Sequence, residues 1–251
     1  DKWIQYAKGK SGLSRWVYNR EGRKLLDFER RVAAEYDATL FVSEYETDLF
    51  RRLSPETAEK AHTMRNGVDG DVFDPGRAYD NPYPSRTEAV VLTGTMDYWP
   101  NVEAALWFME HVLDALLERH PSSHFYVVGA NPTRELEQAG QRRGMTVTGR
   151  VDDVRPYIAH ASVVVAPLRI ARGIQNKVLE GMAMARPVIA SPLALEGIQA
   201  QAGRDVFVAD DPDEFLETLS RVLLEGAGEV GSNGRDLVLR EYSWDANFGK
   251  L

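Results

Sequence analysis

The feature that most constrains this chain is a regular alternation, from about residue 87 onward, of short apolar segments with helical ones. Segment Val163–Ala166 is continuous and rich in β-branched residues, as expected of a strand that is buried on both faces. Between Asn101 and Arg119, apolar residues recur at steps of three and four, which is typical of one helix face. Alternating strands and helices predict a doubly wound parallel sheet, an α/β domain with helices on both faces.

The expected strands cover residues 89–92, 124–128, 145–148, 163–166, 187–190 and 206–208. The expected helices cover residues 101–119, a polar stretch after 129, a short stretch near Asp152, and stretches that begin near Gln175, after Asp211 and after Ser232. No fixed-period repeat interrupts this order.

The residues before this domain have the pattern of a partial second α/β domain. Residues 23–36 have the spacing of an amphipathic helix, whose basic residues make a solvated face or, alternatively, an anion-binding patch. A short apolar run follows, and Ser43 with Glu46 then forms the capping-box pattern of a helix through Leu53. We therefore divide the chain into a partial domain over 1–74, a Pro- and Gly-rich linker over 75–86, the main domain over 87–240 and a closing segment over 241–251.

Composition excludes several classes of function. The chain has 30 Lys and Arg against 38 Asp and Glu, so its formal net charge is −8 and we expect no nucleic-acid partner. It has no cysteine, which excludes disulfides, thiol nucleophiles and cysteine-ligated metals. No apolar run approaches the roughly 18 residues that a membrane helix needs, so we expect at most peripheral membrane association.

Ligands of such sheets bind beyond the carboxyl ends of the strands, and three turns there are candidates. In the first, Gly94 followed by Thr95 allows close approach of a ligand, although a glycine in this place often has only a steric reason. The second, Gly149–Asp153, is also explained as a helix start with Asp152 as its cap and Asp153 beside the helix dipole.

The third turn, from Pro167 to Lys177, is the most informative. It combines Gly173 with three cations, Arg169, Arg172 and Lys177, just before a helix. Cations and the free N–H groups of a helix N-terminus suit a phosphate or diphosphate. Glu180 follows Lys177 by one helical turn, so the two side chains would lie on nearly the same helix face. The alternative interpretation of these two residues is a plain surface ion pair.

At this point the sequence resembles a known family. Segment Gly173–Ser191 resembles the donor-binding signature of the family 4 glycosyltransferases, the retaining group 1 enzymes with the GT-B fold. Four further segments fit the same family: Asn66–Asp69, Gly94–Asn101, Gly149–Asp153 and Tyr242–Trp244. Segments Gly94–Asn101 and Arg172–Lys177 are similar to a bacterial subgroup of sugar transferases tied to exopolysaccharide synthesis.

The resemblance implies two Rossmann-like domains facing a cleft, with the GT-B C-terminal domain holding a nucleotide-sugar donor. Glu180 matches the second acid of the family's Glu-x7-Glu pair, which implies contact with the ribose. Lys177 is implied to hold the diphosphate, together with the backbone N–H groups of Gly173, Ile174, Gln175 and Asn176. The remaining implied contacts are Arg150 and Val151 with the base, and Gly94 and Thr95 with the phosphates or sugar.

Two positions depart from the family pattern. Arg172 stands where the family usually has its first acid, and the Arg–Lys pair that many members carry after the first turn is missing. We expect Arg169, Arg172 and Lys177 to take over the stabilisation of charge, with Arg172 and Lys177 in the catalytic role.

The expected activity is transfer of a sugar, with retention, from a UDP- or GDP-sugar to a saccharide or lipid-linked acceptor in bacterial polysaccharide biosynthesis. We expect no metal, no cofactor and a cytoplasmic location. The N-terminus has the look of a chain cut within a domain, so we expect this piece to bind nucleotide without transferring sugar. The alternative is a non-catalytic nucleotide-sugar-binding or scaffold module, in which Arg172 marks lost chemistry. Activity of the intact parent with a panel of donors would separate the two.

Overall fold

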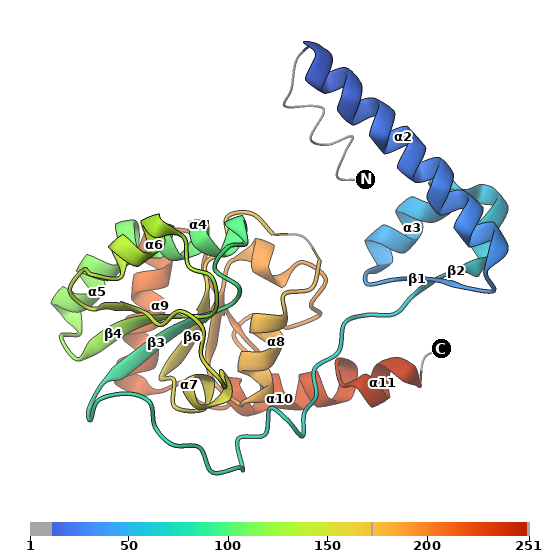
Figure 1. Ribbon diagram of the computed structural model, residues 1–251. Helices are drawn as coiled ribbons and strands as arrows, with labels where there is room; N and C mark the ends of the chain where they lie inside the picture. The colour runs from blue at the N-terminus through green and yellow to red at the C-terminus, as the bar shows by residue number, and fades with distance from the viewer. Residues whose placement is uncertain (1–11, 172, 250–251) are drawn as a thin grey trace. The chain divides into compact units, whose positions relative to one another are not determined.

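The computed structural model describes residues 12–171 and 173–249, and the chain divides into two compact units, up to Arg65 and from Asn66 onward (Figure 1). The described elements of the first unit are α2 (Gly12–Glu35), β1 (Thr39–Phe41), α3 (Glu44–Leu53), a 3-10 helix η1 (Pro55–Lys60) and β2 (Ala61–Thr63). Helix α2 begins well before residue 23, the predicted start, because no proline interrupts the preceding residues.

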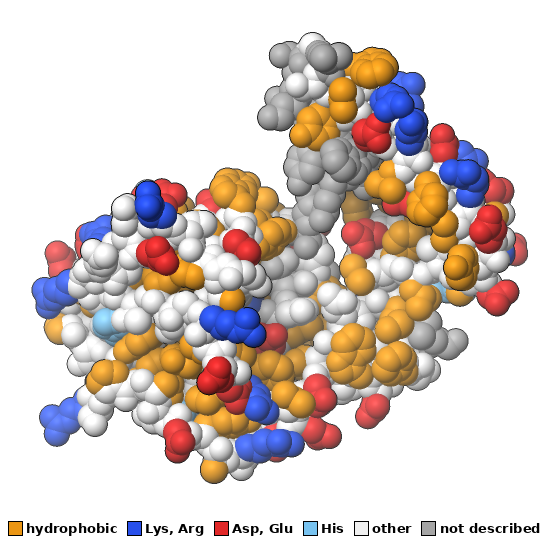
Figure 2. Space-filling view, in the orientation of Figure 1, with side chains coloured by type: hydrophobic (Ala, Val, Ile, Leu, Met, Phe, Trp, Pro, Cys, Tyr) orange, Lys and Arg blue, Asp and Glu red, His pale blue; other side chains and the backbone are white. Residues whose placement is uncertain are grey.

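The first unit has a small core under a parallel pair of strands. β1 pairs with β2, and Ala33, Phe50 and Ala61 form the buried cluster. The predicted cap of α3 is confirmed, because the side chain of Ser43 accepts a hydrogen bond of 3.2 Å from the N–H of Glu46. Apolar side chains also lie on the surface of this unit, as Figure 2 shows, with Trp16 61% and Phe28 55% exposed.

The second unit contains a six-stranded parallel sheet of order β5-β4-β3-β6-β7-β8. Its strands are β3 (Glu88–Thr93), β4 (Ser123–Val128), β5 (Met145–Val147), β6 (Val163–Ala166), β7 (Val188–Ala190) and β8 (Phe207–Val208). All six lie where the sequence pattern predicted a strand. The predicted α/β class with a parallel sheet is therefore confirmed.

Helices cover both faces of this sheet (Figure 1). One face carries α4 (Trp99–Phe108), α5 (Asp114–Arg119), α6 (Arg134–Ala139) and α9 (Pro212–Glu225). The other carries α7 (Arg155–Ala159), α8 (Asn176–Ala183) and α10 (Val230–Glu241), and the last helix is α11 (Trp244–Phe248). No helix among the described residues is long and apolar enough to cross a bilayer.

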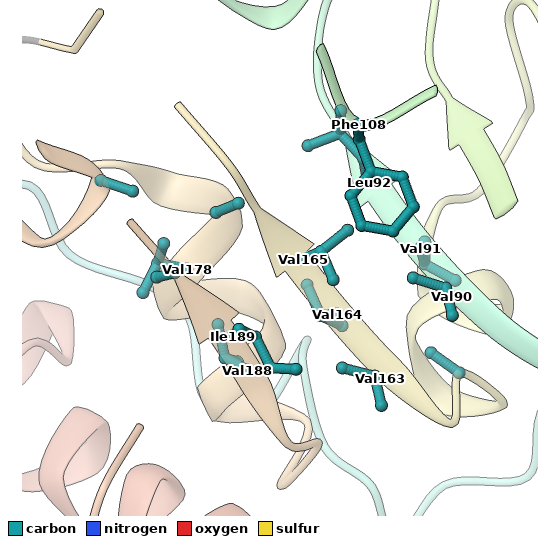
Figure 3. Packing of buried hydrophobic residues seen from close by; sticks show 14 of the residues in the cluster. Val90, Val91, Leu92, Phe108, Val163, Val164, Val165, Val178, Val188 and Ile189 are labelled. Carbon is teal, nitrogen blue, oxygen red and sulfur yellow. The ribbon is translucent and has the colours of Figure 1, made fainter. Parts of the chain in front are cut away.

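The core lies between the sheet and these two helical layers. Figure 3 shows Val90, Leu92 and Phe108 together with the side chains of β6 and β7, and all of them are at most 1% exposed. The β-branched residues at the centre of the sheet are thus buried on both faces, as the apolar run Val163–Ala166 predicted.

Three helical predictions need correction. The expected single helix over 101–119 is α4 and α5 joined by a π-helical segment, Met109–Leu113. This wider turn keeps Met109, Val112 and Leu113 buried, and a period-based prediction does not detect it. α7 begins only at Arg155, and α10 begins at Val230, before Ser232.

Residues 66–86 belong to the second unit although they contain no helix or regular strand. Val68 forms a parallel bridge with Ser243, and the N–H of Val68 donates to the carbonyl of Tyr242 at 2.8 Å. Tyr83 is 7% exposed, donates its hydroxyl to the carbonyl of Tyr157 at 2.6 Å and packs its ring on Tyr126. The unit therefore begins at Asn66, earlier than the boundary drawn at residue 74.

Arg235 on α10 fixes this segment, and its loss should destabilise the second unit. Its guanidinium donates to the carbonyls of Phe73 (2.8 Å) and Ala183 and pairs with Asp74 at 3.3 Å. Since hydrogen bonds to a charged group contribute about 1.5–3 kcal/mol, Arg235→Met should lower the free energy of unfolding by about 2–3 kcal/mol.

Urea unfolding of the two proteins measures this difference. The matched control is Arg240→Met on the same helix, where the side chain is 60% exposed and pairs only with its neighbour Glu241 among the described residues. That control should change stability by less than about 0.5 kcal/mol. Equal losses in both variants would contradict the role given to Arg235.

Candidate functional site

The candidate site lies at the carboxyl ends of β3 and β6, where the winding of the sheet reverses. These two strands are hydrogen-bonded neighbours, yet the helices that follow them, α4 and α8, cover opposite faces of the sheet. The turns after such a pair diverge and leave a crevice, which is the usual ligand position in open α/β sheets. Two of the three predicted turns, at Gly94 and at 167–177, are the ones that flank this point.

The turn after β3 is tightly packed around Gly94. Gly94 has a φ of 151°, and a Cβ built there would lie 2.5 Å from the Nδ2 atom of Asn101. The next glycine along this edge, Gly129, is closer still, since its Cβ would lie 1.7 Å from the carbonyl oxygen of Gly94. The steric explanation of Gly94 is therefore sufficient by itself. Thr95 is exposed beside it, and contact of either residue with a donor stays a prediction.

The turn after β6 leads into the N-terminus of α8. Gly173 has a φ of 68°, which favours glycine, and the side chain of Gln175 donates to its carbonyl at 3.0 Å. Ile174 is 8% exposed and packs into the core, so only its backbone is available to a ligand. Asn176 opens the helix with its side chain exposed, and the first N–H groups of α8 have no acceptor within the helix. Arg172 lies outside the described residues.

Lys177 is a buried cation at this site. The residue is 8% exposed. Its Nζ donates hydrogen bonds to Asn101 Oδ1 at 2.9 Å and to Gln175 Oε1 at 3.5 Å. Burial lowers the pKa of Lys177 to about 8, while the nearby Glu180 carboxylate acts in the opposite direction. Lys177 therefore carries its charge at neutral pH but is close to losing it.

Glu180 lies one turn further along α8. Burial raises the pKa of its carboxyl group, and the Lys177 ammonium lowers it. Glu180 is half-buried and acts on the Lys177 ammonium electrostatically, but the two side chains form no ion pair among the described residues, so the exposed surface pair that the sequence left open is not present. Contact of Glu180 with a ribose stays a prediction.

Arg169 is engaged by other groups of the second unit. Its guanidinium donates to the Asp210 carboxylate at 2.7 Å and lies over the ring of Trp107, 5.2 Å from the centroid. These contacts were not expected from the sequence, and a role of Arg169 at a phosphate stays a prediction.

The turn at Gly149–Asp153 precedes a helix, as expected, but a different aspartate from the expected one contacts the start of that helix. The Oδ1 atom of Asp153 accepts a 2.9 Å hydrogen bond from the N–H of Arg155, where α7 begins. Asp153, not Asp152, therefore serves the helix start, and the cap assigned to Asp152 is wrong. Arg150 is exposed and Val151 is half-buried, so their contact with a base stays a prediction.

Asn101 is the residue of this site that sequence reasoning missed. It lies in the first turn of α4, it is 4% exposed, and it joins the two turns through Thr95 and Lys177. The sequence pattern places it at the start of a helix and at the end of the family-like segment Gly94–Asn101, and gives it no role at the site. The available signal was a polar residue at a buried helix start just after a glycine turn. Among the described residues, no group of three or more His, Asp or Glu is arranged to hold a metal ion.

Comparison with known proteins gives a family match and a set of similar folds. The family described as glycosyl transferases group 1 matches residues 87–225, more than half of the chain. Comparison with curated protein sequences gave no significant match.

Among solved structures, a glycosyltransferase from Rickettsia africae is 15% identical with a TM-score of 0.70, over 90% of this chain and 65% of that protein. Anabaena HepE, solved in complex with UDP and glucose, is 15% identical with a TM-score of 0.68, over 90% and 64%. This chain thus spans slightly less than two thirds of both proteins. The C-terminal domain of the group 1 family protein LpcC from Francisella tularensis is 18% identical with a TM-score of 0.56, over 71% of this chain and 100% of that domain.

Proposed function

This chain belongs to the group 1 glycosyl transferases, and we propose that its second unit binds the diphosphate of a nucleotide-sugar donor. In the parent protein the donor would be a UDP- or GDP-sugar. The sugar passes, with retention of configuration, to a saccharide or lipid-linked acceptor. HepE, a protein of similar fold, was solved with UDP and glucose, which supports this class of donor.

The observation that carries the proposal is the environment of Lys177 at the reversal point of the sheet. Among the described residues, the acceptors of its Nζ hydrogen bonds are two neutral amide oxygens, those of Asn101 and Gln175. A buried charge is costly unless it is paired, so this ammonium is suited to an anion that arrives from outside. A diphosphate at this place would also meet the free N–H groups of α8.

The chemistry assigned to these groups is electrostatic. The Lys177 ammonium and the N–H groups of α8 stabilise the negative charge that develops on the departing nucleoside diphosphate. Arg172 is assigned the same role, and Glu180 accepts hydrogen bonds from the ribose hydroxyls. Residues Arg150 and Val151 flank the base. A role in bacterial polysaccharide biosynthesis, in the cytoplasm and with at most peripheral membrane contact, belongs to the same proposal.

Calorimetric titration with UDP, GDP and ADP tests the proposal, and Glu180→Gln tests the ribose contact. A neutral amide accepts hydroxyl hydrogen bonds more weakly than a carboxylate does, so this variant should bind its best nucleotide about three- to tenfold more weakly. Its affinity for inorganic pyrophosphate, which has no ribose, should be unchanged. The matched control is Glu225→Gln at the exposed end of α9.

Two results would contradict the proposal. If none of the three nucleotides binds, the second unit is not a donor site. If Glu180→Gln weakens pyrophosphate and nucleotide equally, the substitution has damaged α8 and the ribose contact is not supported.

A further inference from the structure

Asn101 uses both ends of its side-chain amide, and its two partners come from opposite sides of the reversal point. Its Oδ1 accepts from Lys177 Nζ at 2.9 Å, and its Nδ2 donates to the carbonyl of Thr95 at 2.9 Å. The orientation of the amide is fixed chemically, because an ammonium only donates and a carbonyl only accepts. Its backbone N–H is also satisfied, by the carbonyl of Tyr98 at 2.9 Å.

We propose that Asn101 is a positioning residue that holds the ammonium of Lys177 in place for the diphosphate and locks the two turns together. This inference rests on the proposed function of Lys177. A lysine side chain is long and flexible, so an ammonium without a fixed acceptor would be distributed over several positions. A hydrogen bond to the charged form also favours that form, which counteracts the effect of burial.

The space around Gly94 supports the same role. A side chain at position 94 would occupy the place of the Asn101 amide, since the added Cβ would lie 2.5 Å from Nδ2 and 3.1 Å from Cγ. Glycine at this turn therefore leaves room for the Asn101 side chain, which reaches both Thr95 and Lys177. The turn after β3 and the first turn of α8 are thereby fixed relative to each other before a ligand binds.

A double-mutant cycle tests whether Asn101 acts through Lys177. The variants are Asn101→Ala, Lys177→Ala and the double variant, titrated with whichever of UDP, GDP and ADP binds most tightly and with the corresponding nucleoside. Asn101→Ala should weaken the diphosphate about fivefold and leave the nucleoside unchanged. In the Lys177→Ala background the same substitution should change the affinity less than twofold, because its target is already absent.

The pH dependence of binding is a second readout that a merely structural role would not change. Of the described groups that act on Lys177, Glu180 titrates, whereas Asn101 and Gln175 do not. Asn101→Ala should lower the pH at which diphosphate affinity begins to fall. Asn101→Asp, which keeps an acceptor and adds a negative charge, should raise it, and this variant also serves if Asn101→Ala does not fold.

The matched control is Asn233→Ala, since among the described residues its side chain donates one hydrogen bond, of 3.2 Å, to the carbonyl of Arg204 at the surface. Equal weakening by Asn101→Ala in both backgrounds, or an unchanged pH profile in both Asn101 variants, would overturn the inference. If Lys177→Ala itself leaves diphosphate affinity unchanged, the assignment of Lys177 to the phosphates fails instead.

Discussion

The Lys177→Met variant is expected to bind nucleoside diphosphate about 10- to 100-fold more weakly than the unmodified chain, and yet to unfold at a higher temperature without ligand. The loss of affinity follows from hydrogen bonds to a charged group, which contribute about 1.5–3 kcal/mol, or about tenfold per 1.4 kcal/mol. Methionine fills the same space without a charge, so the packing around α8 is kept.

The gain in stability follows from the lowered pKa of Lys177. Burial lowers this pKa from 10.5 to about 8, so between these pH values the unfolded chain binds more protons than the folded one. The folded state is therefore penalised at neutral pH by holding a buried charge, and methionine removes that penalty. Part of this gain is lost because the Oδ1 atom of Asn101 no longer has a hydrogen-bond donor. The expected net increase in the free energy of unfolding is about 1 kcal/mol, which corresponds to an increase of about 2–4 °C in the unfolding temperature.

Calorimetric titration and thermal unfolding measure the two effects. The control is Lys24→Met, since Lys24 is an exposed residue of α2 and neither quantity should change there. If Lys177→Met binds the diphosphate with unchanged affinity, the phosphates do not contact Lys177. A large fall in unfolding temperature would mean that Lys177 stabilises the fold rather than serving a ligand.

Diphosphate affinity of the unmodified chain is expected to fall about tenfold as the pH rises from 7 to 9. With a pKa of about 8, Lys177 is mostly charged at pH 7 and mostly neutral at pH 9. Binding of the diphosphate raises the pKa of Lys177. Above pH 8 the lysine must therefore take up a proton when the ligand binds, and the affinity falls by about tenfold for each further pH unit. The phosphate groups remain ionised throughout, because their second pKa is about 6.

The measurement is a series of titrations at constant ionic strength in buffers of known ionisation enthalpy, which also report the proton uptake. Lys177→Met should give a nearly constant affinity over the same range and so corrects for any titration of the base. An affinity that is independent of pH in the unmodified chain, or equally dependent in the variant, would exclude Lys177 as the titrating group.

The sheet and most helices were predictable because their signals are local. Four consecutive apolar residues, Val163–Ala166, of which the three valines are β-branched, suit a strand between two helical layers. Asp211 accepts from the N–H of Glu214 and opens α9, as its place before an apolar period indicates. The π-helical segment was not predictable, since one wider turn barely changes the spacing of buried residues.

Residues 66–86 show where local patterns stop being informative. Proline and glycine in this stretch indicate the absence of regular structure, and none is present. Its attachment, however, depends on partners far along the chain: Arg235 contacts Phe73 and Asp74, and Tyr83 contacts Tyr157. The periodicity of apolar residues cannot predict such pairs, because they depend on which helix covers which face of the sheet.

For the candidate site, the sequence by itself determined the turns and the residue types: glycine at 94, and Lys177 and Glu180 one helical turn apart. Parallel strands place successive turns at one edge, so this much follows from chain order. Only the tertiary structure decided the interaction partners of these side chains: Asn101 accepts a hydrogen bond from Lys177, and Asp210 forms an ion pair with Arg169. The physical reason is that strand order brings β3 beside β6, and hydrogen bonds act over about 3 Å in space whatever the separation in sequence.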